Sequence, residues 1–463
     1  MINGELVAGA RALDVINPAM GKPFAVASRA DEAQLNSAVA AAKRAFPTWS
    51  ALPVDQRRTK LLAWAEAIEA RIPELAALLV AEQGKPMPEA MFETGLVPAA
   101  LRIVSASELA PRVLQENATT RVIRHNTPLG VVAAIAPWNF PVMLMMLKVI
   151  PALITGNTVV AKPAPTTPLT MLLLGQIAAN VLPPGVLNVI VDDNDLGSLL
   201  TGHPDVAKIA FTGSTTTGRK VMQSAVSTLK RLTLELGGND AAIVLDDVDV
   251  KAVAQKVYMA AMMNAGQICV AAKRVYVPSR LYDGFCEELA TLARFTVVGD
   301  GAREGTQMGP IQNRRQFDRL GEYLADAHEH GKIIAGGAPL PGDGYFIPPT
   351  IVRDIPDDTR LVREEQFGPV LPVLRYDDID DAIRRANDNE YGLAGTIWTA
   401  DPQRAVGIAM KIDTGTVWIN KHLDLHFDVA MGGAKYSGLG EAMGQEGLEA
   451  YTQRKVIDVA LQG

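Results

Sequence analysis

The chain has 463 residues, of which 48% are hydrophobic and 21% charged, and it carries a formal net charge of −7. This length exceeds what one hydrophobic core organises, so we expect about three modules, and the composition excludes a disordered or fibrous protein. Because Lys and Arg are scattered through an acidic chain, nucleic acid and anionic membrane are excluded as electrostatic partners.

The first part of the chain is predicted to be mostly helical. Residues 31–46 and 55–70 place apolar side chains at helical spacing, with charges on the opposite face. Between residues 111 and 135, β-branched residues alternate with polar ones around Asn117 and around an Asn-Thr-Pro turn, which predicts a hairpin. Because this hairpin is so polar, we expect it to project from the body.

Residues 129–161 form the most apolar segment of the chain. Prolines, asparagines and Lys148 divide it into pieces much shorter than the ~20 apolar residues that a membrane span requires. It is therefore predicted to be buried core, without a membrane partner. The N-terminus has acidic and glycine residues where a signal peptide has a basic start, which favours a cytoplasmic protein.

Short apolar runs that end in Gly, Pro or Ser alternate with helical stretches through the rest of the chain. These runs are residues 157–163, 185–191 and 206–214, followed by a second series at 241–247, 274–279, 368–376, 394–399 and 415–420. Such alternation predicts an α/β protein with two open parallel sheets and a cleft at the carboxyl ends of the strands.

The two cysteines, Cys269 and Cys286, lie apart from each other and from any Cys/His cluster. This excludes a disulfide framework and a zinc site, so no metal is expected, and it fits a reducing cytoplasm. Cys286 lies on an amphipathic helix and is predicted to pack there. For Cys269, the local sequence favours packing over a nucleophilic role, because nothing adjacent resembles a base.

Two motifs are suited to an anionic cofactor. Gly213 and Ser214 end a strand and lead into a helix through Gly218, an arrangement that binds phosphate or that forms a plain strand-to-helix turn. Lys162 follows a buried strand, where it either reaches a ribose or phosphate or caps the strand at the surface.

Two further residues are candidates for catalysis. Glu235 stands between leucines, and an acid in apolar surroundings can act as a general base, although the alternation with Thr233 favours a solvent-facing acid. Asn139 is fixed between two prolines, where its amide either donates to an oxyanion or forms a turn.

In chain order, the segments PWNFP, AKPAP, FTGSTTTG, LELGGND, GQIC, EEQFGPV and MGGAKYSGLG resemble the aldehyde dehydrogenase superfamily, and the resemblance covers nearly the whole chain. It implies a Rossmann-like cofactor domain (1–110 and 129–235), a catalytic domain (236–444) and a β oligomerisation arm (111–128 and 445–463). The arm implies a homodimer or homotetramer.

The resemblance also implies roles for individual residues. Cys269 would attack an aldehyde, Asn139 would stabilise the oxyanion, and Glu235 would activate the water that hydrolyses the thioester. The residues implied to bind NAD or NADP are Ile135, Ala136, Pro137, Trp138, Lys162, Ala164, Pro165, Gly213, Ser214, Gly218, Leu236, Gly237, Glu365 and Phe367.

Two sequence features refine this assignment. Glu235 favours hydrolysis to a free acid over transfer of the acyl group to coenzyme A; a coenzyme A-acylating dehydrogenase and a non-catalytic protein that retains the fold are the alternatives. Pro165 stands where many NAD-dependent relatives carry a glutamate, which removes a repulsion toward a 2'-phosphate, so NADP is expected to be accepted beside NAD. Apolar residues along 140–147 and beside Cys269 suit a medium-sized aliphatic or aromatic aldehyde.

Overall fold

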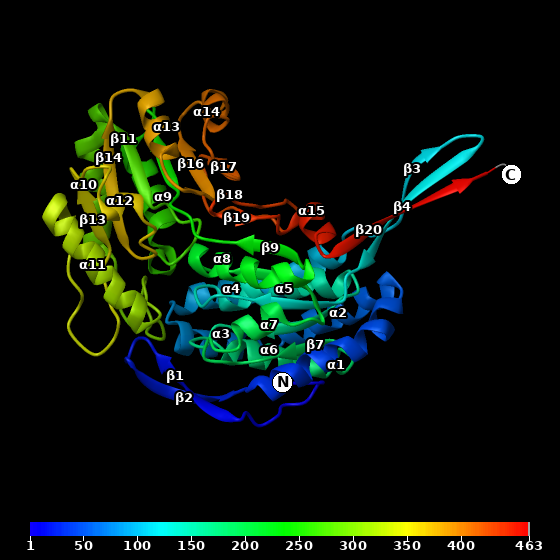
Figure 1. Ribbon diagram of the computed structural model, residues 1–463. Helices are drawn as coiled ribbons and strands as arrows, with labels where there is room; N and C mark the ends of the chain where they lie inside the picture. The colour runs from blue at the N-terminus through cyan, green and yellow to red at the C-terminus, as the bar shows by residue number, and fades with distance from the viewer. Residues whose placement is uncertain (462–463) are drawn as a thin grey trace.

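The computed structural model describes residues 1–461 and contains two open sheets with helices around them (Figure 1). The first sheet has the strand order β19-β9-β8-β5-β6-β7, and all its neighbouring strands are parallel except β19, which is antiparallel to β9. Its strands are β5 (Val131–Ile135), β6 (Thr158–Lys162), β7 (Leu187–Val189), β8 (Val206–Thr212), β9 (Arg231–Glu235) and β19 (Gly438–Leu439). β5, β6 and β8 are almost wholly buried, as expected of parallel strands covered on both faces.

Helices cover both faces of this sheet. They are α1 (Glu32–Ala51), α2 (Val54–Glu69), α3 (Ile72–Gln83), α4 (Met87–Ser105), α5 (Pro141–Ile154), α6 (Leu169–Ala179), α7 (Gly197–Gly202) and α8 (Thr215–Ala225), with a 3-10 turn η1 (Val226–Thr228). The very apolar segment 129–161 forms β5, α5 and β6, and α5 lies in the largest hydrophobic core. Within residues 1–461, no helix combines the length and the hydropathy needed to cross a membrane.

The second sheet has the order β12-β13-β14-β11-β10-β16-β17 and is parallel apart from the β12–β13 pair. Its strands are β10 (Ala241–Val244), β11 (Arg274–Pro278), β12 (Lys332–Ala335), β13 (Thr350–Arg353), β14 (Val370–Tyr376), β16 (Ala394–Trp398) and β17 (Thr416–Ile419). Its helices are α9 (Val250–Met262), η2 (Met263–Gly266), α10 (Ser279–Phe295), α11 (Arg314–His330), α12 (Arg360–Arg363), α13 (Ile379–Asn387) and α14 (Pro402–Ala409). The predicted α/β class with two open sheets is confirmed.

A three-stranded sheet projects from the body (Figure 1). It consists of β3 (Arg112–Glu116), β4 (Thr120–Pro128) and the last strand β20 (Thr452–Ala460), which pairs with β4 along its whole length. The hairpin predicted around Asn117 therefore exists, and the segment near the C-terminus completes it. The two-residue strands β15 (Tyr391–Gly392) and β18 (Ala434–Lys435) pair with each other, and helix α15 (Gly444–Glu449) precedes β20.

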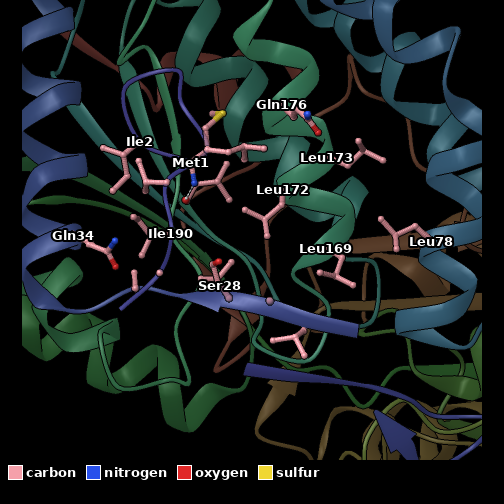
Figure 2. A pocket seen from close by; sticks show the side chains of 18 of the residues that line it. Met1, Ile2, Ser28, Gln34, Leu78, Leu169, Leu172, Leu173, Gln176 and Ile190 are labelled. Carbon is pink, nitrogen blue, oxygen red and sulfur yellow. Dashed lines mark hydrogen bonds between the residues drawn. The ribbon is translucent and has the colours of Figure 1, made fainter. Parts of the chain in front are cut away.

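The N-terminal segment differs from the mostly helical prediction. β1 (Arg11–Asn17) and β2 (Lys22–Arg29) form an antiparallel hairpin before α1 begins. This segment and α6 enclose an apolar pocket of about 450 Å³, which Figure 2 shows with Met1, Leu172 and Ile190 pointing into it. None of the predicted catalytic residues lines this pocket, so it is separate from the candidate site.

Candidate active site

The carboxyl edge of the first sheet gathers the residues predicted to bind the cofactor. Ala136 follows β5, Lys162 ends β6, and Gly213 follows β8. The chain order reverses between β5 and β8, since β6 and β7 lie on one side of β5 while β8 and β9 lie on the other. Such a switch point opens the crevice in which α/β proteins bind dinucleotides.

Helix α8 begins at this crevice. Ser214 is its N-cap and accepts a hydrogen bond from the Thr217 backbone N–H at 3.3 Å. Gly218 is buried, and a Cβ there would meet a Leu236 methyl carbon at 2.4 Å, so glycine lets α8 pack closely against the end of β9. The N-terminal turn of α8 therefore presents backbone N–H groups, as a pyrophosphate site requires.

Lys162 is buried, with only 6% of its side chain exposed, and its Nζ lies 2.6 Å from Oδ1 of Asp192. The interpretation of Lys162 as a surface lysine is therefore wrong. Asp192 follows β7, the neighbour of β6, so the pair joins the ends of two adjacent strands. Pro165 is half-buried in the turn beyond β6.

The loop before Cys269 has an unusual backbone. Asn264, Ala265 and Gly266 are all left-handed, with φ of 51°, 54° and 68°. A Cβ on Gly266 would meet the backbone oxygen of Gly368 at 2.4 Å, which only glycine avoids. Lys273 Nζ also donates to the Gly266 carbonyl at 2.6 Å. This packing fixes the half-buried thiol of Cys269 at the end of the turn.

The surroundings of Cys269 keep its thiol protonated. Burial, together with the nearby carboxylates of Glu235 and Glu365, raises the pKa of Cys269 to about 12. A thiol with this pKa is a poor nucleophile at neutral pH until a base removes its proton. Cys286 lies wholly buried on α10, as predicted for a packing residue.

Glu235 ends β9 and is half-buried, which is intermediate between the apolar and the solvent-facing interpretations. Thr212 Oγ1 donates to its carboxylate at 3.3 Å, and Lys148 Nζ donates to Thr212 Oγ1 at 2.6 Å. Burial lowers the pKa of Lys148, while the carboxylate of Glu235, and the sulfur of Cys269 when it is deprotonated, oppose that shift. The acid, the thiol and the lysine therefore lie within electrostatic reach of one another.

Asn139 is 3% exposed and is held from both ends. Its Nδ2 donates to the Gln267 carbonyl at 2.9 Å, and its own carbonyl accepts from Lys85 Nζ at 3.1 Å and from Asn264 Nδ2 at 3.0 Å. Because an amide nitrogen carries two hydrogens and one is donated to Gln267, the second N–H of Asn139 stays available beside the loop that leads to Cys269. Asn139 is thus more than a turn residue.

Behind Asn139 lies an ion pair that sequence reasoning missed. Lys85 Nζ lies 2.5 Å from Glu93 Oε2, and both side chains are completely buried. Glu93 also accepts hydrogen bonds from the backbone N–H groups of Val142 and Met143, at the start of α5. The pair thereby connects α3 and α4 to the segment that carries Asn139.

Glu365 and Phe367 lie between α12 and β14 and contact residues that follow strands β9 and β5 of the first sheet. Glu365 Oε1 accepts from the Gly238 backbone N–H at 2.9 Å, and a Cβ on Gly237 would meet Glu365 Oε2 at 2.5 Å. The rings of Phe367 and Trp138 make an edge-on contact at 5.5 Å. The structure thus brings Glu365 and Phe367 into contact with predicted cofactor residues that follow the strands of the first sheet.

Apolar side chains surround the thiol. Cys269 packs in one cluster with Phe140, Ile268, Val270, Leu423 and Met431. Of the other residues predicted for the pocket, Met143, Leu144 and Leu147 belong to the large core around α5. The groups at the carboxyl edge of the first sheet fit a nicotinamide dinucleotide, since a helix N-terminus would face its phosphates, a lysine would lie at its ribose and apolar side chains adjoin the thiol.

Comparison with known proteins agrees with this geometry. The family model described as "Aldehyde dehydrogenase family" matches residues 7–457. A mitochondrial aldehyde dehydrogenase of Leishmania tarentolae is 37% identical, over 99% of this chain and 94% of its own. The NADP-dependent succinate-semialdehyde dehydrogenase of Escherichia coli is 36% identical, over 100% of this chain and 97% of its own.

Solved structures give the same result. The NAD complex of an aldehyde dehydrogenase from Bacillus cereus superposes with a TM-score of 0.97 at 33% identity, covering 100% of this chain and 96% of the other. A family model over nearly the whole chain and relatives this similar leave no other assignment. The chain belongs to the aldehyde dehydrogenase family and is an NAD(P)-dependent oxidoreductase.

Proposed function

We propose that this enzyme oxidises an aldehyde to the free carboxylic acid with Cys269 as nucleophile. The thiol sulfur would add to the carbonyl carbon and give a thiohemiacetal, after loss of the thiol proton to a base. Bound NAD or NADP supplies the hydride acceptor that turns this adduct into a thioester. Hydrolysis of the thioester would then free Cys269 for another turnover.

Asn139 and Glu235 have complementary roles in this scheme. The available N–H of Asn139 would donate to the oxygen that becomes negative when sulfur adds, and its fixed position lets it do so without reorganisation. Glu235 would take a proton from the water that attacks the thioester. Lys148 donates a hydrogen bond to Thr212, which donates one to Glu235, and these two bonds would orient that carboxylate.

One observation carries the choice of hydrolysis: a carboxylate, Glu235, lies within electrostatic reach of Cys269 and is oriented by Thr212. A coenzyme A-acylating enzyme has no need of a base for water at this position. A non-catalytic protein has no need of the buried ion pair and hydrogen bonds that hold Asn139 beside the nucleophile loop.

The test is a panel of aldehydes incubated with NAD or NADP in the absence of coenzyme A, with reduced cofactor measured by absorbance. We expect continuous turnover in the wild type and none in Cys269→Ala. Glu235→Gln is expected to form about one equivalent of acyl-enzyme and then stop, which intact-protein mass spectrometry detects as a covalent adduct on Cys269. Undiminished turnover of Cys269→Ala, or reduced cofactor only after addition of coenzyme A, would overturn the proposal.

The apolar cluster around Cys269 supports a medium-sized aliphatic or aromatic aldehyde as substrate.

We also propose the domain limits that the family resemblance implies. They are a cofactor domain of residues 1–110 and 129–235, a catalytic domain of residues 236–444, and an oligomerisation arm of residues 111–128 and 445–463. The exposed strands of that arm support a homodimer or homotetramer, because a projecting sheet has free edges to pair with another subunit. Two unpaired cysteines support a cytoplasmic location.

A further inference from the structure

The end of the cofactor crevice near Lys162 carries more negative than positive charge. Lys162 is paired with Asp192, and beyond it Arg29 pairs with Asp195 at 2.8 Å and with Asp193 at 3.5 Å. The group thus holds two cations and three carboxylates. The sequence alone showed Lys162 without a carboxylate beside it, because Asp192 comes from the next strand.

The ion pair changes what Lys162 can offer a ligand. Asp192 is wholly buried, and its Oδ2 accepts from the Leu196 backbone N–H at 3.0 Å, so the carboxylate is fixed in place. A fixed anion 2.6 Å from Nζ cancels the field of the lysine for any ligand beyond it. The ammonium keeps its N–H donors, which suit a ribose hydroxyl, but it loses the net charge that attracts a phosphate.

We propose that Asp192 makes this enzyme prefer NAD to NADP by neutralising Lys162 at the adenosine ribose. A 2'-hydroxyl finds a donor there at no electrostatic cost, whereas the dianionic 2'-phosphate of NADP meets a neutral pair and the partly exposed Asp193 and Asp195. The carboxylate of Asp192, which follows β7, would thus act at the ribose. Pro165 stands after β6, where many NAD-dependent relatives carry the glutamate that acts there. The inference rests on the proposed ribose site at Lys162.

The test is isothermal titration calorimetry of the full-length protein with NAD and with NADP, without aldehyde. We expect the wild type to bind NAD at least about tenfold more tightly, which corresponds to about 1.4 kcal/mol. Asp192→Asn keeps the shape and the acceptor for Leu196 but frees the charge of Lys162, so the ratio should shift toward NADP by about tenfold. Asp193→Asn is expected to shift it in the same direction by less.

Asp205→Asn is the matched control. Asp205 is a carboxylate of the same lobe paired with Lys43, but it precedes β8 and so lies at the opposite edge of the sheet. Asp205→Asn removes one negative charge, as Asp192→Asn does, but it should leave the ratio of NAD to NADP affinity unchanged. The control therefore distinguishes an effect of Asp192 at the ribose from an effect of the protein's net charge.

Lys162→Ala distinguishes the two levels of the argument. Weaker binding of both cofactors supports the ribose site, whereas unchanged binding of both would overturn that site. Suppose that Lys162→Ala weakens the binding of both cofactors. The role of Asp192 is then refuted, and the ribose site stands, if the wild type binds NADP as tightly as NAD. The same conclusion follows if neither Asp192→Asn nor Asp193→Asn changes the ratio of NAD to NADP affinity.

Discussion

The buried Lys85–Glu93 pair lends itself to a sharp experiment. Lys85→Met would leave the Glu93 carboxylate inside the core with two backbone N–H donors and no counter-charge. Breaking such a pair from one side costs about 3–5 kcal/mol, because an uncompensated charge stays buried. The double variant Lys85→Met/Glu93→Gln removes both charges and should recover a large part of that loss.

Urea unfolding followed by tryptophan fluorescence measures these effects as shifts of the midpoint. Arg71→Met is the control, because Arg71 forms a similar ion pair with Glu74 at 2.7 Å but on the surface, and its midpoint should stay near that of the wild type. Lys85→Met should also lower kcat, since Lys85 holds the Asn139 carbonyl. A single variant as stable as the wild type, or a double variant no more stable than the single one, would refute the reasoning.

Three further outcomes are expected. Because burial raises the pKa of Cys269 to about 12, iodoacetamide should alkylate Cys269 in the cofactor-free enzyme about tenfold faster for each pH unit between pH 7 and 10. Mass spectrometry should find the buried Cys286 unmodified. An alkylation rate that reaches a plateau below pH 9 would contradict this. Gly266→Ala, with φ of 68° and a backbone oxygen 2.4 Å from the new Cβ, should cost about 2 kcal/mol or more and lower kcat, whereas Gly321→Ala, with open space around it, should do neither. Burial lowers the pKa of Lys208 from 10.5 to about 7. Between these two pH values the unfolded chain binds a proton that the folded chain has lost, so the free energy of unfolding should rise with pH. The same pH slope of the urea midpoint in Lys208→Met and in the wild type would contradict this.

Much of the fold was accessible from sequence, because each parallel strand is a short apolar run closed by turn-forming residues. Strands β6, β8 and β14 fall inside predicted runs. The β1–β2 hairpin was missed since its strands are largely exposed and mix polar with apolar residues, which leaves no clear period. Antiparallel β19 was missed because two residues carry no pattern at all.

The site divides in the same way. Cys269, Glu235 and Asn139 were predicted through a family resemblance, since no local pattern connects a thiol with a carboxylate and an amide that lie far away in sequence. Lys148 had a usable signal, a single cation in an otherwise apolar helix. Asp192 had none, because which carboxylate of the Asp-Asp-Asn-Asp run pairs with Lys162 depends on how β6 and β7 are aligned.

Strand β19 has a consequence for the timing of biosynthesis. It pairs Gly438 with Glu235, and the Leu236 backbone N–H donates to the Ser437 carbonyl at 2.8 Å, so the strand that carries Glu235 is completed by residues that are translated about 200 residues later. The roughly 170 residues between Cys269 and Gly438 take about 10–30 s to synthesise. During that interval the nascent chain carries Cys269 without the completed sheet edge at Glu235. Strand β9 therefore keeps an unpaired edge until the residues of β19 have been translated.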